Sequence, residues 1–142
     1  LFEDLQTTFK TMLKCDTGVA YTNKMVYYYM FRPDSIEGAK FSENKLNSAI
    51  NVFNIMNSYE SSFNGDVKLA LKSKLCSFCF HLVLKMPEGY QKGEVLYNYI
   101  RKVRWKVLFN RKTRIKNRLA CACSFLGFKV TKALFALIDR RA

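Results

Sequence analysis

The chain has 142 residues, and its 24 Lys and Arg against 11 Asp and Glu give a net charge of +13. This length supplies one domain's worth of material, and a hydrophobic share of 49% argues against a disordered chain. Five cysteines without a secretory signal do not predict a disulfide framework; they indicate a reduced, cytoplasmic context. From Lys92 onward there are fourteen Lys or Arg against Glu94 and Asp139, which predicts a negatively charged partner for the last third.

The first expected element is a short helix that begins at the acidic pair Glu3 and Asp4. Its apolar positions recur at helical spacing, and they are Leu5, Phe9, Met12 and Leu13. Gly18 predicts a left-handed residue that ends this helix. Carboxylates are favoured at a helix N-terminus by its unpaired N–H groups and its dipole, so the pair has a structural explanation beside a catalytic one.

The order of motifs at the N-terminus resembles the C-terminal part of the catalytic domain in glycosyltransferase family 2. These GT-A enzymes extend bacterial polysaccharides, and they carry an aromatic-E-D-aliphatic step followed by Y-Y-Y-x-x-R-x-G-S-I. The matching positions are Phe2-Glu3-Asp4-Leu5, Val26-Tyr27-Tyr28-Tyr29, Arg32, Ser35 and Ile36. Asp34 replaces the family's usual Gly, and Asp adopts a positive-φ turn more readily than most residues. The resemblance covers roughly the first quarter of the chain.

The resemblance implies transfer of a sugar, with inversion, from a nucleotide-sugar donor to a polysaccharide or lipid-linked acceptor. Asp4 would take the acceptor proton, Glu3 would orient the acceptor or cap the helix, and Arg32 and Tyr29 would contact substrate. The family's nucleotide-binding half, whose D-x-D motif holds Mg²⁺ or Mn²⁺, has no counterpart here, so we expect an inactive fragment without a cofactor of its own. A solvated cation at Arg32 and strand packing of the tyrosines remain alternatives.

The expected fold is mainly α. Residues 1–40 would form a short helix and a β-hairpin remnant of a GT-A domain, and residues 41–142 a bundle of about four helices. Ser42 would cap the first, Asn64-Gly65-Asp66 would separate it from the second, and the fourth would run from about Lys112 to the end. The inward positions of the first three are Leu46, Ile50, Phe53 and Met56; Val67, Leu71, Leu75, Phe78 and Leu82; and Leu96, Ile100, Val103 and Val107.

The last expected helix combines a basic stripe with a broad apolar surface. On one continuous helix a line of cations would be formed by Arg111, Arg118, Lys129 and Arg140, flanked by Arg114 and Lys132. Leu119 to Ile138 is long enough to span a bilayer, but Lys129 and Lys132 would each cost roughly 2.5–3.5 kcal/mol at its centre. We therefore expect peripheral association with the anionic cytoplasmic leaflet, beside lipid-linked acceptors. The expected interfacial aromatics are Tyr99, Trp105 and Phe109.

The helical region offers two further candidate sites. Nucleic-acid binding rests on charge alone, since no helix-turn-helix, zinc-finger or RNP-like pattern accompanies it. Cys76 and Cys79 share a helix face while His81 points away, and Cys121 and Cys123 diverge by about 200°, so no metal site is expected. Two function hypotheses follow: a glycosyltransferase fragment, or a non-catalytic basic helical module that binds anionic membrane or nucleic acid. The oligomeric state stays open.

Overall fold

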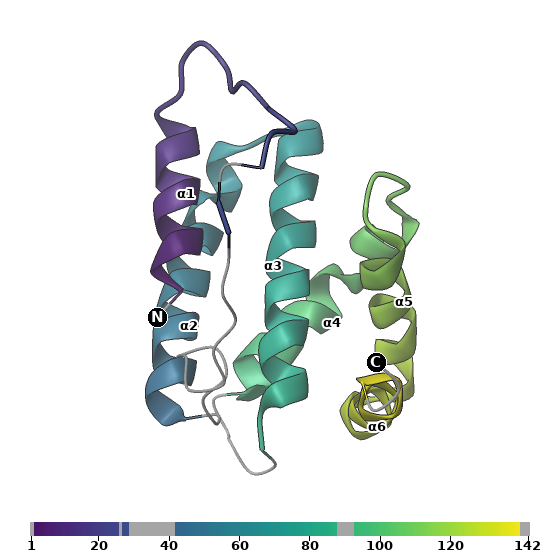
Figure 1. Ribbon diagram of the computed structural model, residues 1–142. Helices are drawn as coiled ribbons and strands as arrows, with labels where there is room; N and C mark the ends of the chain where they lie inside the picture. The colour runs from purple at the N-terminus through teal and green to yellow at the C-terminus, as the bar shows by residue number, and fades with distance from the viewer. Residues whose placement is uncertain (1, 26, 29–41, 88–92, 140–142) are drawn as a thin grey trace. The chain divides into compact units, whose positions relative to one another are not determined.

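A computed structural model describes residues 2–25, 27–28, 42–87 and 93–139 of the protein (Figure 1). Within these ranges the chain forms six α-helices and two 3₁₀ helices and no strand, which confirms the mainly α fold. The expected β-hairpin is not supported: residues 14–25 and 27–28 contain no strand, and the rest of that segment lies outside the described ranges. The chain divides into two compact units, Leu1–Met56 and Asn57–Ala142.

The first helix of the N-terminal unit, α1, spans Glu3–Leu13 and has no buried residue. Its end differs from the prediction. The backbone N–H of Lys14 donates to the carbonyl of Thr11 at 3.0 Å, so a tight turn closes the helix without a left-handed residue. Gly18, with φ of 115°, lies in the following coil.

The second helix, α2, spans Glu43–Ser58 and begins where the sequence predicts. The Ser42 hydroxyl accepts a hydrogen bond from the backbone N–H of Lys45 at 3.2 Å, which satisfies one of the unpaired donors of the first turn. Its buried residues follow a helical period, and they are Leu46, Ala49, Val52, Phe53 and Met56. Ile50, expected among them, is half-buried.

In the C-terminal unit, the 3₁₀ helix η1 (Tyr59–Ser62) precedes α3 (Gly65–Lys85). Helix α3 packs along α4 (Gly93–Phe109), and α4 in turn packs against α5 (Ile115–Cys123). The core of this unit is built largely from residues of α3 and α4, and they are Leu71, Leu75, Cys76, Cys79, Leu82, Val83, Leu96, Ile100, Val103 and Val107. The predicted inward positions are confirmed except for Val67, which is exposed.

The expected fourth helix is broken into three pieces: α5, the 3₁₀ helix η2 (Ser124–Leu126) and α6 (Phe128–Asp139). The prediction of one unbroken helix is therefore wrong. Gly127 has φ of 96° and ψ of 163°, a backbone conformation open almost exclusively to glycine, so the chain changes direction there. The Thr131 hydroxyl donates to the carbonyls of Cys123 and Gly127 at 2.9 and 2.8 Å and fixes the new direction. Figure 1 shows α6 nearly end-on beside the foot of α5.

Candidate membrane-binding surface

Helix α4 presents two large aromatic side chains to solvent. Trp105 is 56% exposed and Phe109 is 70% exposed, although both residues belong to a helix whose opposite face lies in the core. They are four residues apart, the spacing at which side chains meet on one helix face. Their rings stack with centroids 5.6 Å apart and planes inclined by 4°. The two parallel rings therefore form an aromatic stack on the solvent-facing side of α4.

Phe125 extends this aromatic stack from α4 to η2. Its ring meets Trp105 edge-on with centroids 4.6 Å apart, and the Arg104 guanidinium lies 3.8 Å from its centroid. Arg104 also donates to the carbonyl of Ser124 at 2.9 Å, and the Tyr97 hydroxyl donates to the same oxygen at 3.1 Å. These bonds hold η2 against α4 and so fix the position of Phe125.

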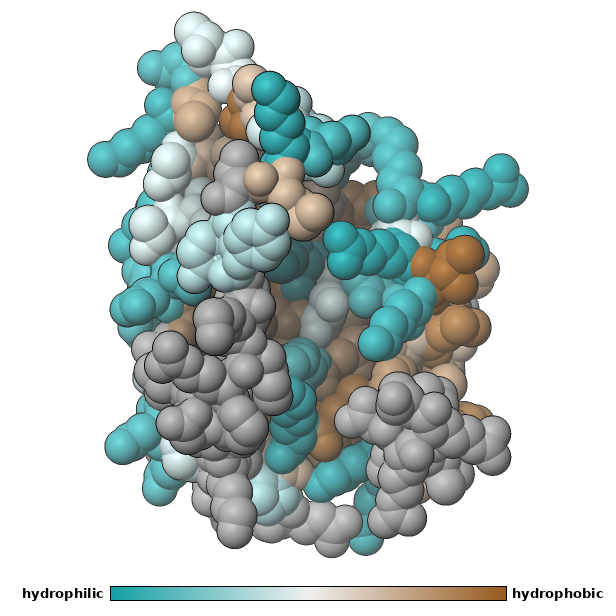
Figure 2. Space-filling view, viewed as in Figure 1, coloured by the Kyte–Doolittle hydropathy of each residue, from teal (hydrophilic) through white to brown (hydrophobic). Residues whose placement is uncertain are grey.

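The outer side of α5 adds aliphatic side chains. Ile115, Leu119 and Ala122 recur at helical spacing and are exposed, while Ala120 and Cys121 on the other side are buried. Leu126 follows in η2 and is also exposed. Figure 2 shows hydrophobic side chains gathered on the side of the molecule where α5 lies. We call the exposed set Trp105, Phe109, Ile115, Leu119, Phe125 and Leu126 the α4–α5 surface.

Cations accompany this surface on α4, on α5 and on the connection between these helices, and α6 adds one more. The exposed ones are Arg101, Lys102 and Lys106 of α4, Arg111, Lys112 and Arg114 of the α4–α5 connection, Lys116 of α5 and Lys129 of α6. From the start of α4 to the end of α6 the acidic residues are Glu94 and Asp139. Because cations far outnumber carboxylates between Gly93 and Asp139, this part of the chain carries a strong net positive charge.

The predicted basic stripe is not one line on one helix. Arg111 lies in a turn and Arg114 is the N-cap of α5, while Lys129 lies on α6 beyond the break. Two of the predicted cations are used internally: Arg118 Nε donates to the carbonyl of Leu108 at 2.8 Å, and Lys132 Nζ to that of Met86 at 2.5 Å. Arg140 lies outside the described residues.

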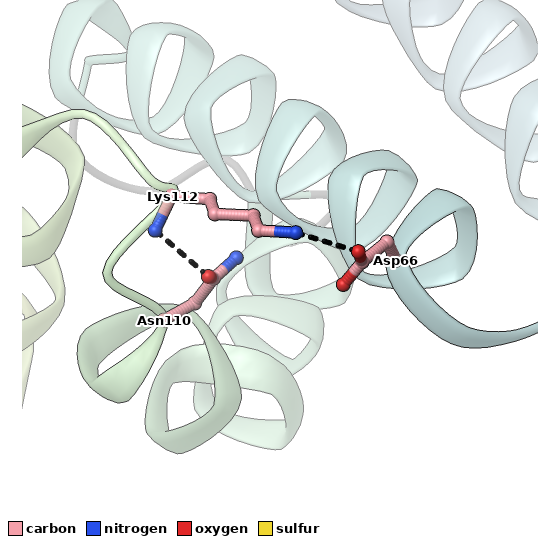
Figure 3. Close-up of polar contacts among 3 residues, drawn as sticks. All are labelled: Asp66, Asn110 and Lys112. Carbon is pink, nitrogen blue, oxygen red and sulfur yellow. Dashed lines mark hydrogen bonds and ion pairs between the residues drawn. The ribbon is translucent and has the colours of Figure 1, made fainter.

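The connection between α4 and α5 is held to the start of α3 (Figure 3). Lys112 Nζ lies 2.6 Å from Asp66 Oδ2, and the Lys112 backbone N–H donates to Asn110 Oδ1 at 3.0 Å. Both charged side chains of the ion pair are about three-quarters exposed, at 75% and 74%.

Of the three aromatics predicted for an interface, Trp105 and Phe109 are exposed and Tyr99 is not. Tyr99 is buried in the core, and that burial, with a smaller contribution from Glu60, raises the pKa of its hydroxyl. Sequence reasoning missed Ile115 and the cations of α4. The signal was present, because Arg101, Trp105 and Phe109 follow one another at four-residue spacing on a face with no core residue.

The residues implied by the glycosyltransferase resemblance are placed only in part. Glu3 and Asp4 lie in the first turn of α1 and are exposed, and the preceding Phe2 has φ of 65°. Tyr29 and Arg32 lie outside the described residues.

The described part of the chain contains neither a metal-binding group nor a membrane-spanning helix. No three His, Cys, Asp or Glu side chains there are grouped so that they could hold a metal ion. None of the described helices combines the length and apolar character that crossing a bilayer requires. No protein-family model, curated protein or solved structure matches the chain.

Proposed function

We propose that the C-terminal unit binds anionic membranes at their surface through the α4–α5 surface. The observation that carries this proposal is the exposed stack of Trp105 and Phe109, joined to Phe125 and flanked by Arg101 and Lys102. Aromatic rings favour the headgroup level of a bilayer, and Lys and Arg at that depth face the anionic phosphates. The expected site of action is the cytoplasmic face of a membrane.

Electrostatic attraction and apolar burial contribute separately in this proposal. Each Lys or Arg near an anionic surface contributes about 1 kcal/mol, so the exposed cations around the α4–α5 surface together supply several. Apolar side chains that enter the interface add about 25 cal/mol per Å² of surface removed from water. Both contributions are needed for lasting association, because one weak anchor gives only marginal and reversible binding.

The aliphatic residues favour a membrane over a nucleic acid. A protein that follows phosphates needs cations, and exposed rings can stack on bases. Exposed Leu119, Leu126 and Ile115 have no such use against a phosphate backbone, but they are the side chains that a lipid interface accepts.

Sedimentation with vesicles tests the proposal. The chain should pellet with vesicles that contain phosphatidylserine, far less with phosphatidylcholine alone, and a duplex DNA competitor at equal charge should not release it. Equal pelleting with both vesicles would show that electrostatic attraction to anionic lipid does not contribute to binding. Pelleting with neither would overturn the proposal. Tight DNA binding without vesicle binding would favour the nucleic-acid alternative.

We propose a second function for the N-terminal segment from its family resemblance. In this reading the segment forms the acceptor side of a family 2 glycosyltransferase, Asp4 is the base, and the nucleotide sugar and a divalent metal bind on a nucleotide-binding half. The location of Glu3 and Asp4 in the exposed first turn of α1 supports it, since a base must reach an acceptor hydroxyl.

A substitution in an enzyme that joins this segment to a nucleotide-sugar-binding half tests the second function. Asp4→Asn should abolish sugar transfer and leave donor binding intact. Asp16→Asn, in the exposed coil after α1, is the matched control and should retain transfer. An active Asp4→Asn enzyme would overturn the assignment of the base.

A further inference from the structure

Two cysteines from different helices meet inside the C-terminal unit. Cys76 of α3 and Cys121 of α5 are both fully buried, and their Sγ atoms are 3.7 Å apart. Hydrogen bonds on the same side of α3 fix this approach: Ser77 Oγ donates to Asn117 Oδ1 at 3.2 Å, and the hydroxyls of Ser73 and Thr113 are 3.2 Å apart. These polar contacts join α3 to α5 and to the turn before α5, and so keep the two sulfurs close together.

The surroundings of the two thiols shift their pKa values in opposite directions. The hydrogen bond shared with Cys76 lowers the pKa of Cys121, and the positive charge of Arg104 lowers it further, against the opposing effect of burial. The same hydrogen bond and burial raise the pKa of Cys76. Of the two thiols, Cys121 therefore loses its proton more readily, and the thiolate is the nucleophilic form of cysteine.

We propose that Cys76 and Cys121 form a reversible disulfide that joins α3 to α5 when the protein meets a peroxide. The Cys121 sulfur attacks one peroxide oxygen, the O–O bond breaks, and water leaves as Cys121 becomes a sulfenic acid. The Cys76 sulfur then attacks the Cys121 sulfur, the S–O bond breaks, and a second water leaves. Two thiols have lost two electrons to hydrogen peroxide, and a thiol reductant reverses the step.

The other cysteines do not compete for this bond. Cys15 is exposed and belongs to the other compact unit, and Cys123 lies on a different side of α5 from Cys121. Cys79 is buried one turn from Cys76, and burial raises its pKa to about 12, so it stays a protonated thiol. Closing the gap between Cys76 and Cys121 requires the sulfurs to approach from 3.7 Å to about 2.05 Å.

Peroxide titration followed by peptide mapping tests the proposal, in a Cys15→Ser chain that cannot form a dimer through that cysteine. The expected product is a monomer lighter by two hydrogens in which one peptide pair, containing Cys76 and Cys121, is cross-linked and is released by a thiol reductant. The Cys79→Ala control should give the same cross-link.

Two outcomes would overturn the proposal. One is a folded, peroxide-treated chain in which Cys76 and Cys121 remain alkylatable after unfolding while the exposed Cys15 of the unsubstituted chain is fully oxidised. The other is a cross-link to Cys79 or Cys123 instead. A Cys76→Ala chain adds an independent readout, because its Cys121 has no resolving partner and should be trapped by a sulfenic-acid probe such as dimedone. Circular dichroism would establish that this variant is folded.

Discussion

Trp105 on α4 and Phe125 in η2 meet edge to face with ring centroids 4.6 Å apart, and this contact joins two elements into one aromatic surface. Trp105→Ala combined with Phe109→Ala should lower partitioning onto phosphatidylserine vesicles at least tenfold, because two exposed rings no longer enter the interface. Vesicle sedimentation measures this loss. The matched control is Tyr21→Ala combined with Tyr28→Ala, which removes two exposed rings from the N-terminal unit and should leave partitioning unchanged. Equal losses in both pairs would show that the binding surface lies elsewhere.

Charge should act independently of the aromatic rings. Arg111→Gln combined with Lys116→Gln removes two exposed cations near the α4–α5 surface, at about 1 kcal/mol each, so partitioning should fall by about thirtyfold. The loss should shrink as salt rises, because the Debye length falls to about 3 Å at 1 M. Lys10→Gln with Lys14→Gln, two exposed cations at the end of α1, is the control of equal charge. If both pairs weaken binding alike, net charge rather than this surface is responsible.

Two ion pairs of α3 among the described residues should differ in their effect on stability. Lys72 Nζ lies 3.0 Å from Glu60 Oε1 with side chains 11% and 25% exposed, whereas the Lys112–Asp66 pair is open to water. Glu60→Gln leaves a buried ammonium without its carboxylate and should lower the free energy of unfolding by about 2 kcal/mol. Asp66→Asn should lower it by at most about 0.5 kcal/mol. Urea denaturation measures both, and a larger effect of Asp66→Asn would contradict this account.

Substitution of Gly127 should destabilise the protein, although a side chain at this position would have open space around it. No atom lies within 4 Å of a Cβ built there, so the cost of Gly127→Ala is conformational and should be about 1–3 kcal/mol of unfolding free energy. Gly18→Ala is the matched control, since Gly18 also has open space and positive φ but lies in an exposed coil. Because an exposed coil can relax its backbone, thermal and urea unfolding should show a larger loss for Gly127→Ala than for Gly18→Ala. If Gly127→Ala left the free energy of unfolding unchanged, the positive φ at Gly127 would not be needed for the packing of α5 and α6.

The helices of the core were predictable because their apolar residues recur at a single period. Leu96, Ile100, Val103 and Val107 are buried as that period requires, and Ser42 caps α2 as its side chain permits. The break at Gly127 was not predictable, since an apolar helical pattern continues through it. The turn depends instead on the hydrogen bonds that Thr131 makes with Cys123 and Gly127.

The sequence indicates which part of the chain is rich in cations and exposed apolar residues, but not how these residues are arranged. Membrane binding by the last third stays a prediction. The α4–α5 surface, however, joins α4 to η2, and a contact such as that between Trp105 and Phe125 depends on tertiary packing that helical periodicity does not encode. The same holds for Cys76 and Cys121, which no local spacing brings together.

Fluorescence of Trp105 tests the central proposal most directly, because it is the one tryptophan of the sequence and lies in the α4–α5 surface. With phosphatidylserine vesicles its emission should shift to shorter wavelength, and lipids brominated on their acyl chains should quench it. Phosphatidylcholine vesicles should produce far less of either change. Unchanged emission under conditions where the chain pellets with anionic vesicles would contradict the account, because the chain would then bind through a different surface.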